Sequence, residues 1–322
     1  MQWDKIDIKT IDDAEVVSAQ APIIISASRS TDIPAFYSDW FIDRLRKGYL
    51  KWKNPFNGVP LTVSFRKTRA IVFWTKNPRP MMKHLEYLEQ NYPQFYFQFS
   101  LNDYDDEKYE AKVPKLASRI ETFKVLSNRI GKKRVIWRFD PLILTQDIDV
   151  TDLLRRVESI GNQLKGYTEK LVFSFADIAI YKKVERNLRK EQVDYIEFTK
   201  ETMTELAEGI CHLNKKNQWS LKLGTCAEQI DLERIGVEHN KCIDDDLFAE
   251  LYPEDKELMD FLGFEQCQES ETTDQLDMFT SPSEEDNAAS TQVRKKAKVR
   301  KLKDKGQRED CGCGYSKDIA RI

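Results

Sequence analysis

The feature that most constrains the fold is a short apolar segment that runs into polar residues and then into a helix-like stretch. The first copy, Ile23 to Ile25 followed by Ser26 to Pro34, has the β-branched residues typical of a buried strand. Strands that alternate with helices favour a parallel sheet whose carboxyl ends meet at one edge. Such segments occur six times, at 23–25, 70–74, 95–99, 135–137, 171–175 and 221–223. The sequence therefore predicts an α/β fold, specifically a partial (β/α)6 TIM-like barrel.

The segments between these strands have the apolar spacing of helices. Phe36, Trp40, Phe41 and Leu45 share one helical face, and Gly48 follows as a stop signal. Two short apolar segments, 49–52 and 61–65, flank a turn and predict a hairpin. The predicted helices cover 34–47, 80–90, 114–130, 150–164, 192–214, 244–252 and 255–262.

The composition changes along the chain and suggests three parts. The 322 residues are enough for one large core. The partial barrel is predicted over 1–264, since apolar periodicity is lost beyond it. Residues 265–302 are expected to form a disordered insert, acidic and then basic. A tail with a Cys-x-Cys pair, 303–322, is expected to pack back on the barrel.

Charge and hydropathy bear on location and partners. The formal net charge is −3, and no apolar segment is long enough to span a bilayer. No apolar N-terminal run follows a positively charged start, so we expect a cytoplasmic protein without a membrane partner. The basic run from Arg294 to Arg308 could contact nucleic-acid phosphates or a protein partner. Such a run is more often a solvated linker.

Four of the six cysteines are candidate metal ligands. A chain without a signal peptide favours free thiols or metal ligands over disulfides. Four thiolates suit either zinc or an iron–sulfur cluster such as [4Fe-4S], and spacing does not choose between them. Alternatively, Cys226 is a small buried hydrophobe and the tail pair is incidental. The candidate metal ligands are Cys226, Cys242, Cys311 and Cys313.

Polar residues gather where the predicted strands end, which is where barrels collect binding and catalytic groups. Asp140 and Glu228 are the candidate proton acceptors, and arginines there could bind a carboxylate or phosphate. Alternatively, Arg138 and Asp140 form ion pairs that hold the strand ends together. A further possibility is a metal-assisted hydrolase that uses the aspartates and glutamates at these strand ends. The presence of only three histidines argues against it but leaves a carboxylate site open. The candidate substrate-binding residues are Arg29, Asp32, Lys76, Asn102, Arg138 and Asp177.

Five motifs stand out along the chain: Ser26 to Phe36, Phe73 to Pro78, Trp137 to Pro141, Thr225 to Glu228 with Cys242 to Asp244, and Lys305 to Cys313. Together they resemble a prokaryotic family known only as domain-of-unknown-function family 1848. The resemblance covers nearly the whole chain except the insert. The family has no established activity, so the resemblance implies no particular reaction.

Members of that family typically end in a cysteine-rich segment that resembles the cluster loop of radical S-adenosylmethionine enzymes. Those enzymes are similarly built on partial barrels of six strand–helix units. Here the sequence closes with Ala320 to Ile322, where the family continues with a glycine and three cysteines. The cysteines that would bind the S-adenosylmethionine cluster are therefore missing from this sequence. If the natural chain also ends at Ile322, radical chemistry would need a partner that supplies that cluster.

Two hypotheses from different classes follow. The first is a barrel enzyme, related to radical S-adenosylmethionine proteins, with a four-cysteine iron–sulfur or zinc site beside a polar substrate pocket. The second is a non-catalytic module that binds nucleic acid or protein and uses the metal only structurally. The second hypothesis predicts that the run from Arg294 to Arg308 matters more than the residues at the strand ends.

Overall fold

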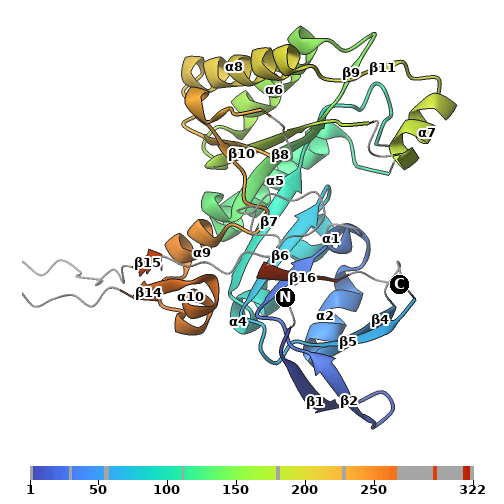
Figure 1. The fold of residues 1–322 in the computed structure, drawn as a ribbon, viewed down its shortest axis with the longest axis vertical. Helices are drawn as coiled ribbons and strands as arrows, with labels where there is room; N and C mark the ends of the chain where they lie inside the picture. Colours follow the sequence, from blue (N-terminus) through green and yellow to red (C-terminus); the bar gives the residue numbers. More distant parts are fainter. Residues whose placement is uncertain are drawn as a thin grey trace, which may run out of the picture.

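In the computed structural model, the central element is an all-parallel sheet of eight strands (Figure 1). The structure describes residues 3–28, 31–53, 58–110, 112–178, 182–226, 230–266, 293–295 and 315–319. The strand order is β13-β12-β10-β8-β7-β6-β3-β16. The strands are β3 (Ile24–Ala27), β6 (Ala70–Thr75), β7 (Gln94–Ser100), β8 (Val135–Leu142), β10 (Lys170–Phe175), β12 (Lys222–Thr225), β13 (Val237–His239) and β16 (Ser316–Ile319).

All six predicted strands are present and lie side by side in chain order, from β3 to β12. Two strands that the sequence did not predict extend the sheet, β13 at one edge and β16 at the other. Among the described residues no pairing joins β13 to β16, so no barrel closes. The mixed α/β class with a parallel sheet is confirmed, whereas the TIM-like curvature stays a prediction.

Helices follow most of these strands. Helix α6 has the predicted bounds, and Gly48 and Gly131 end α2 and α5 with positive φ angles of 79° and 92°. The helices are α1 (Ile33–Phe36), α2 (Ser38–Lys47), α3 (Arg79–Met82), α4 (Leu85–Asn91), α5 (Leu116–Ile130), α6 (Val150–Leu164), α7 (Lys182–Lys190), α8 (Lys200–Lys216), α9 (Asp245–Leu251) and α10 (Lys256–Leu262).

The helix predicted over 192–214 begins later than expected. Residues Tyr195–Ile196 form β11, which pairs antiparallel with β9 (Leu144–Thr145). Helix α8 then starts after Thr199, whose side chain accepts a hydrogen bond from the Thr202 amide in a capping box. The first part of the predicted helix is therefore a strand and a cap.

Smaller sheets flank the main one. The predicted hairpin is present as β4 (Tyr49–Lys53) and β5 (Pro60–Ser64), and it joins β1 (Lys5–Lys9) and β2 (Val16–Gln20) in a four-stranded sheet. The predicted insert at 265–302 lies outside the described residues except at its ends. There β14 (Phe264–Gln266) pairs with β15 (Val293–Lys295).

The two faces of the main sheet are covered differently. Alternate residues such as Phe73, Phe97 and Trp137 join the helices of the strand–helix units in the larger hydrophobic core. Their neighbours on the opposite, inner face, such as Val72 and Ile136, pack against α9 and α10, which are orange in Figure 1. Among the described residues, no helix combines the length and apolar character needed to cross a membrane.

Candidate functional site

The inner face of the sheet changes from apolar to polar toward the carboxyl ends of its strands. On β8 the change occurs between Ile136, which is in the apolar core, and Arg138, two residues further on the same face. We call the polar region the inner-face cluster, and it comprises Trp74, Gln98, Arg138, Asp140, Ser174, Cys226, Asn240 and Cys242.

Arg138 lies at the centre of the inner-face cluster. Its guanidinium donates to the Asp140 carboxylate from Nε at 3.0 Å and from Nη2 at 2.5 Å, and to Gln98 Oε1 from Nη1 at 3.2 Å. The guanidinium also lies over the Trp74 ring, 5.1 Å from its centroid. These contacts commit the nitrogens of Arg138 to protein groups. The ion pair with Asp140, which the sequence left open as an alternative, is present.

Asp140 is the more accessible partner of this pair. Its side chain is 28% exposed, whereas that of Arg138 is 3% exposed. Burial alone would raise the pKa of Asp140, but the Arg138 charge and the Ser174 hydroxyl, which donates to Asp140 Oδ1, lower it below its ordinary value. Asp140 is therefore an ionised carboxylate at neutral pH that can accept a hydrogen bond from a bound molecule.

Two cysteines that are 16 residues apart in the sequence meet in the cluster. A hydrogen bond between the Cys226 and Cys242 thiols and the burial of Cys226 raise the pKa of Cys226 well above its ordinary range, although Arg138 opposes the shift. Cys226 Sγ accepts from Arg138 Nη2 at 3.5 Å and from Asn240 Nδ2 at 3.1 Å. The remaining Asn240 oxygen, Oδ1, is buried and has no hydrogen-bond partner in the part of the chain that the structure describes.

A chain of hydrogen bonds links the inner-face cluster to the strand ends. Asn102 follows β7, and its side chain donates to the Asp140 carbonyl at 3.1 Å and accepts from the Asp140 amide at 2.8 Å. Asn102 Nδ2 also donates to Glu110 Oε1, and this carboxylate oxygen pairs with the Lys76 ammonium. The structure thus connects Lys76, Asn102 and Asp140, three residues singled out from the sequence.

Asp32 lies at the same edge of the sheet, and the hydrogen bonds of its carboxylate hold the local backbone in place. Its carboxylate accepts from the Lys76 amide at 2.7 Å and caps α1 through the Ala35 amide at 2.9 Å. Burial raises the pKa of Asp32 in spite of these two hydrogen bonds. Asp177 lies two residues beyond β10 and is partly buried.

Several predicted site residues lie outside the described part of the chain. These residues are Arg29, Glu228, Cys311 and Cys313. Their roles, and those of the other predicted binding residues, stay predictions. The same holds for the predicted nucleic-acid contact, since Arg294 and Lys295 are the only basic residues of that run within the described ranges.

The sequence did not single out four members of the site: Gln98, Glu110, Ser174 and Asn240. Gln98 and Ser174 interrupt otherwise apolar strands at inner-face positions, a signal that strand alternation could have revealed. Glu110 and Asn240 lie in loops, and nothing in their local sequence marks them.

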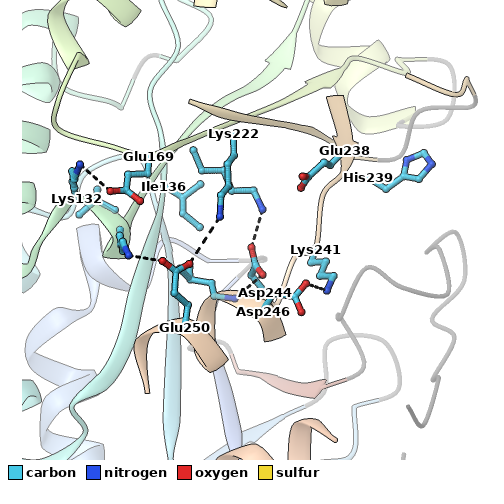
Figure 2. Close-up of a pocket in the computed structure, with 14 residues that line it drawn as sticks. Lys132, Ile136, Glu169, Lys222, Glu238, His239, Lys241, Asp244, Asp246 and Glu250 are labelled. Carbon is cyan, nitrogen blue, oxygen red and sulfur yellow. Dashed lines mark hydrogen bonds and ion pairs between the residues drawn. The ribbon is translucent and has the colours of Figure 1, made fainter. Parts of the chain in front are cut away.

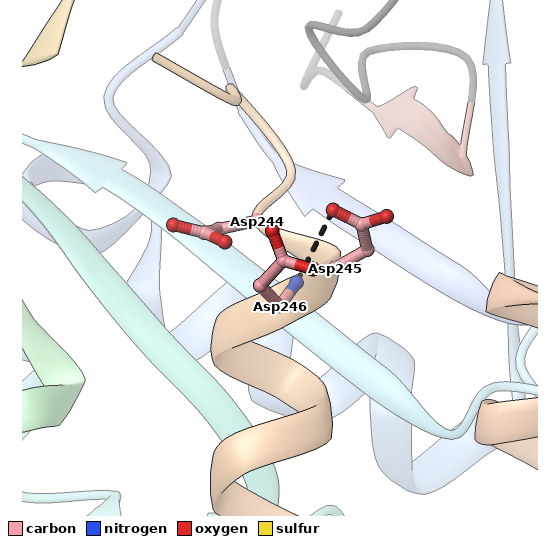
Figure 3. Close-up of side chains that lie close together, drawn as sticks. All are labelled: Asp244, Asp245 and Asp246. Carbon is pink, nitrogen blue, oxygen red and sulfur yellow. Dashed lines mark hydrogen bonds between the residues drawn. The ribbon is translucent and has the colours of Figure 1, made fainter. Parts of the chain in front are cut away.

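Three consecutive aspartates at the start of α9 lie close together (Figure 3). Asp244 accepts from Lys170 at 2.8 Å and caps α9, and Lys241 pairs with Asp245 at 2.6 Å and with Asp246. Lys170 and Lys241 therefore compensate much of the negative charge of the three aspartates, and the Asp244 carboxylate also caps α9. These contacts account for the three carboxylates without a metal ion.

A cavity of about 210 Å³ opens at the other end of the sheet, beside the amino ends of β8, β10 and β12 (Figure 2). Most of its charged side chains are paired with one another, as in the contacts of Lys132 with Glu169 at 2.9 Å and of Lys133 with Glu250. In open α/β sheets, ligands bind beside the carboxyl ends of the strands, which is the opposite end from this cavity. The inner-face cluster is therefore the stronger candidate site.

The family model for a domain of unknown function, DUF1848, matches residues 24–321. The chain belongs to the DUF1848 family. No curated protein and no solved structure matches it. Three of the motifs that resembled DUF1848 in the sequence lie at or just beyond the carboxyl ends of β3, β6 and β8. Membership of DUF1848 thus assigns the family but no reaction.

Proposed function

We propose that this protein is an enzyme with a thiolate-bound metal centre, an iron–sulfur cluster or a zinc ion, and a polar substrate pocket at the carboxyl ends of the strands. The observation that carries the proposal is the contact between the Cys226 and Cys242 thiols in the inner-face cluster. A tetrahedral zinc ion with sulfur at 2.3 Å separates two ligand sulfurs by about 3.8 Å, which is close to the separation of hydrogen-bonded thiols. The two cysteines therefore fit a shared metal.

The raised pKa of Cys226 agrees with such a role. Without a metal, the Cys226 thiol keeps its proton, because a thiolate next to Cys242 in this largely desolvated position would be poorly solvated. A bound cation removes this penalty, since metal ligation deprotonates thiols outright. Arg138 adds positive charge beside the same sulfur.

Cys311 and Cys313 are the proposed remaining ligands. They lie outside the described residues, but Tyr315, two residues after Cys313, is in the same inner-face core against which Cys226 packs. The Tyr315 hydroxyl also interacts electrostatically with Asp245 and Lys241, which flank Cys242 closely in sequence. The chain therefore returns near Cys242 within a few residues of the Cys-x-Cys pair.

The proposed substrate pocket is next to the metal ligands. Arg138 orients the Asp140 carboxylate, Ser174 donates to it, and its partial exposure leaves room for a substrate donor. Asp140 would accept a proton or a hydrogen bond from the substrate, and Lys76 would contribute a cation at the strand ends. When bound, an iron–sulfur cluster would supply electron transfer and a zinc ion would supply a Lewis acid. The proposal includes a relation to radical S-adenosylmethionine proteins, and its support is the sequence resemblance alone.

The proposal is tested by the metal content and visible absorbance of protein purified without oxygen. Iron with sulfide and a brown, reductant-bleachable band would assign a cluster, and zinc would assign a zinc site. Cys226→Ser and Cys311→Ala should each lower bound metal by at least about tenfold. Cys211→Ser is the matched control, because Cys211 is buried on α8 and contacts the Ile235 carbonyl instead. A wild-type chain that takes up no metal, or a Cys226→Ser variant that retains it fully, would contradict the proposal.

A further inference from the structure

Cys226 is partly buried, and its sulfur accepts two N–H hydrogen bonds, which is unusual for a free thiol. One comes from Asn240 Nδ2 at 3.1 Å and the other from Arg138 Nη2 at 3.5 Å. Asn240 is 5% exposed and Arg138 is 3% exposed. Buried donors of this kind are costly unless they are paired, so their convergence on one sulfur indicates a specific role.

The backbone fixes the position of Asn240. Its amide donates to the Thr225 carbonyl at 2.8 Å, which holds it beside Cys226, immediately after β13. Its side chain lies over Gly224, where a Cβ atom would be 3.3 Å from the Asn240 Cβ. The lack of a side chain at Gly224 therefore lets Asn240 approach the strand and reach the sulfur.

We propose that Asn240 is a positioning residue for the metal centre, which orients the Cys226 sulfur and reduces its charge through an N–H···S hydrogen bond, with Arg138 as the second donor. This inference rests on the proposed function. Groups that hydrogen-bond to metal ligands fix the ligand orientation, and hydrogen bonds to ligand sulfurs tune the electronic properties of the metal. Asn240 Oδ1 is buried and, within the described ranges, has no hydrogen-bond partner, so this side chain has hydrogen-bonding capacity left for a further group.

Cobalt(II) is a suitable probe, because its sulfur-to-metal charge-transfer band reports on the ligand sulfurs directly. Asn240→Ala in the full chain should weaken Co²⁺ binding about 10–100-fold and shift this band. Asn240→Asp keeps the size of the side chain but replaces the donor by a carboxylate, so it should weaken binding at least as much. If the Asn240→Ala variant does not fold, Asn240→Asp still tests whether the N–H donor matters for Co²⁺ binding.

Two further variants separate positioning from general stability. Gly224→Ala should displace Asn240 without removing it and give an intermediate loss of affinity, because the added Cβ is tight against the Asn240 side chain. Asn214→Ala is the matched control, since Asn214 hydrogen-bonds only the backbone of Leu221 in the described contacts. Its Co²⁺ affinity and spectrum should equal those of the wild type.

The outcomes distinguish this inference from the proposal beneath it. If wild-type protein binds no Co²⁺, the metal site itself is wrong and the inference falls with it. Suppose instead that wild-type protein binds Co²⁺ and Cys226→Ser does not, which supports the metal site. If Asn240→Ala and Asn240→Asp then match the wild type in affinity and spectrum, only the role of Asn240 is refuted.

Discussion

At the scale of single residues, the site depends on the spacing of Arg138 and Asp140 along β8. Residues two apart on a strand point to the same face, so the guanidinium and the carboxylate meet. The guanidinium is enclosed by Gln98, Trp74 and Asp140, which favours a positioning role for Arg138 over direct binding of a substrate anion. Asp140, at 28% exposure, is the more accessible of the two groups, and under the proposed function it is the one that faces a substrate.

Replacing Asp140 by Asn should therefore destabilise the protein, because Arg138 would remain buried without its counter-charge. We expect a loss of roughly 2–4 kcal/mol in the free energy of unfolding at pH 7, less than for a fully buried pair. The pKa of Asp140 is lowered by Arg138, so its contribution is present above the ordinary value of 3.8 and is lost as the pH falls through the lower folded value. The difference between variant and wild type, measured by urea unfolding, should shrink below about pH 4.

The control for this prediction is Asp152→Asn. Asp152 pairs with Arg155 at 3.3 Å on the surface of α6, where the Arg155 side chain is 68% exposed. Removing such a pair should cost less than about 1 kcal/mol. Equal costs for the two variants would show that the Arg138–Asp140 pair contributes no more than a surface pair.

Proximity to a strand end was the part of the candidate site that the sequence could reveal. Lys76, Asn102 and Asp140 were singled out because each lies near a strand's carboxyl end; the structure links them by hydrogen bonds, and their roles in binding or catalysis stay predictions. The partners that orient them were not found. Glu110 reaches Asn102 from a loop, and Asn240 reaches Cys226 through the register of β13, which no local pattern reveals.

At the scale of elements, apolar spacing predicted the strands and helices whose burial pattern is regular. Helix α6 buries one stripe, including Leu153, Val157 and Ile160, and its predicted bounds are those observed. The short strands β13 and β16 were missed, because three or four residues at a sheet edge carry too little alternation. Their positions depend on pairing with distant segments of the chain.

The contact between α6 and α8 provides a prediction at this scale. A Cβ at Gly161 would lie 2.4 Å from the buried Trp219 ring, whereas a Cβ at Gly209 would meet the ends of the Leu154 side chain. Alanine gains about 1 kcal/mol over glycine in a helix, but overpacking costs about 1–3 kcal/mol. Gly161→Ala should therefore be destabilising and Gly209→Ala nearly neutral, because leucine can change rotamer and the indole cannot move easily.

Thermal or urea unfolding of both variants tests this packing. The indole of Trp219 is also held by a hydrogen bond from Nε1 to Asn162 Oδ1 at 2.9 Å, which restricts its movement. If Gly161→Ala proves as stable as Gly209→Ala, the ring is not fixed against α6 in the way described.

At the scale of the whole molecule, the sheet separates two hydrophobic cores. The larger core lies on the face covered by the helices of the strand–helix units, and the smaller core lies on the inner face, covered by α9 and α10. The smaller core covers the amino half of the inner face and leaves the carboxyl half to the inner-face cluster. The C-terminal strand β16 completes the sheet by pairing with β3, although the two are about 290 residues apart in the chain. The sheet is therefore completed by segments from opposite ends of the described chain, which explains why the position of β16 could not be predicted from local patterns.

This arrangement predicts that weakening β16 should weaken metal binding without changing a ligand. Ile319 is fully buried between β3 and the helices, and Ile319→Ala should cost about 2–5 kcal/mol and loosen the strand that follows Cys313. Because that strand returns the chain to the inner face, the affinity for Co²⁺ should fall, and the β3 amides should exchange faster with deuterium. Ile8→Ala is the matched control, since Ile8 is 3% exposed in the separate core of β1 and β2. It should lower stability while leaving the Co²⁺ affinity unchanged, and an equal fall in affinity for both variants would mean that global stability, not the docking of β16, controls the site.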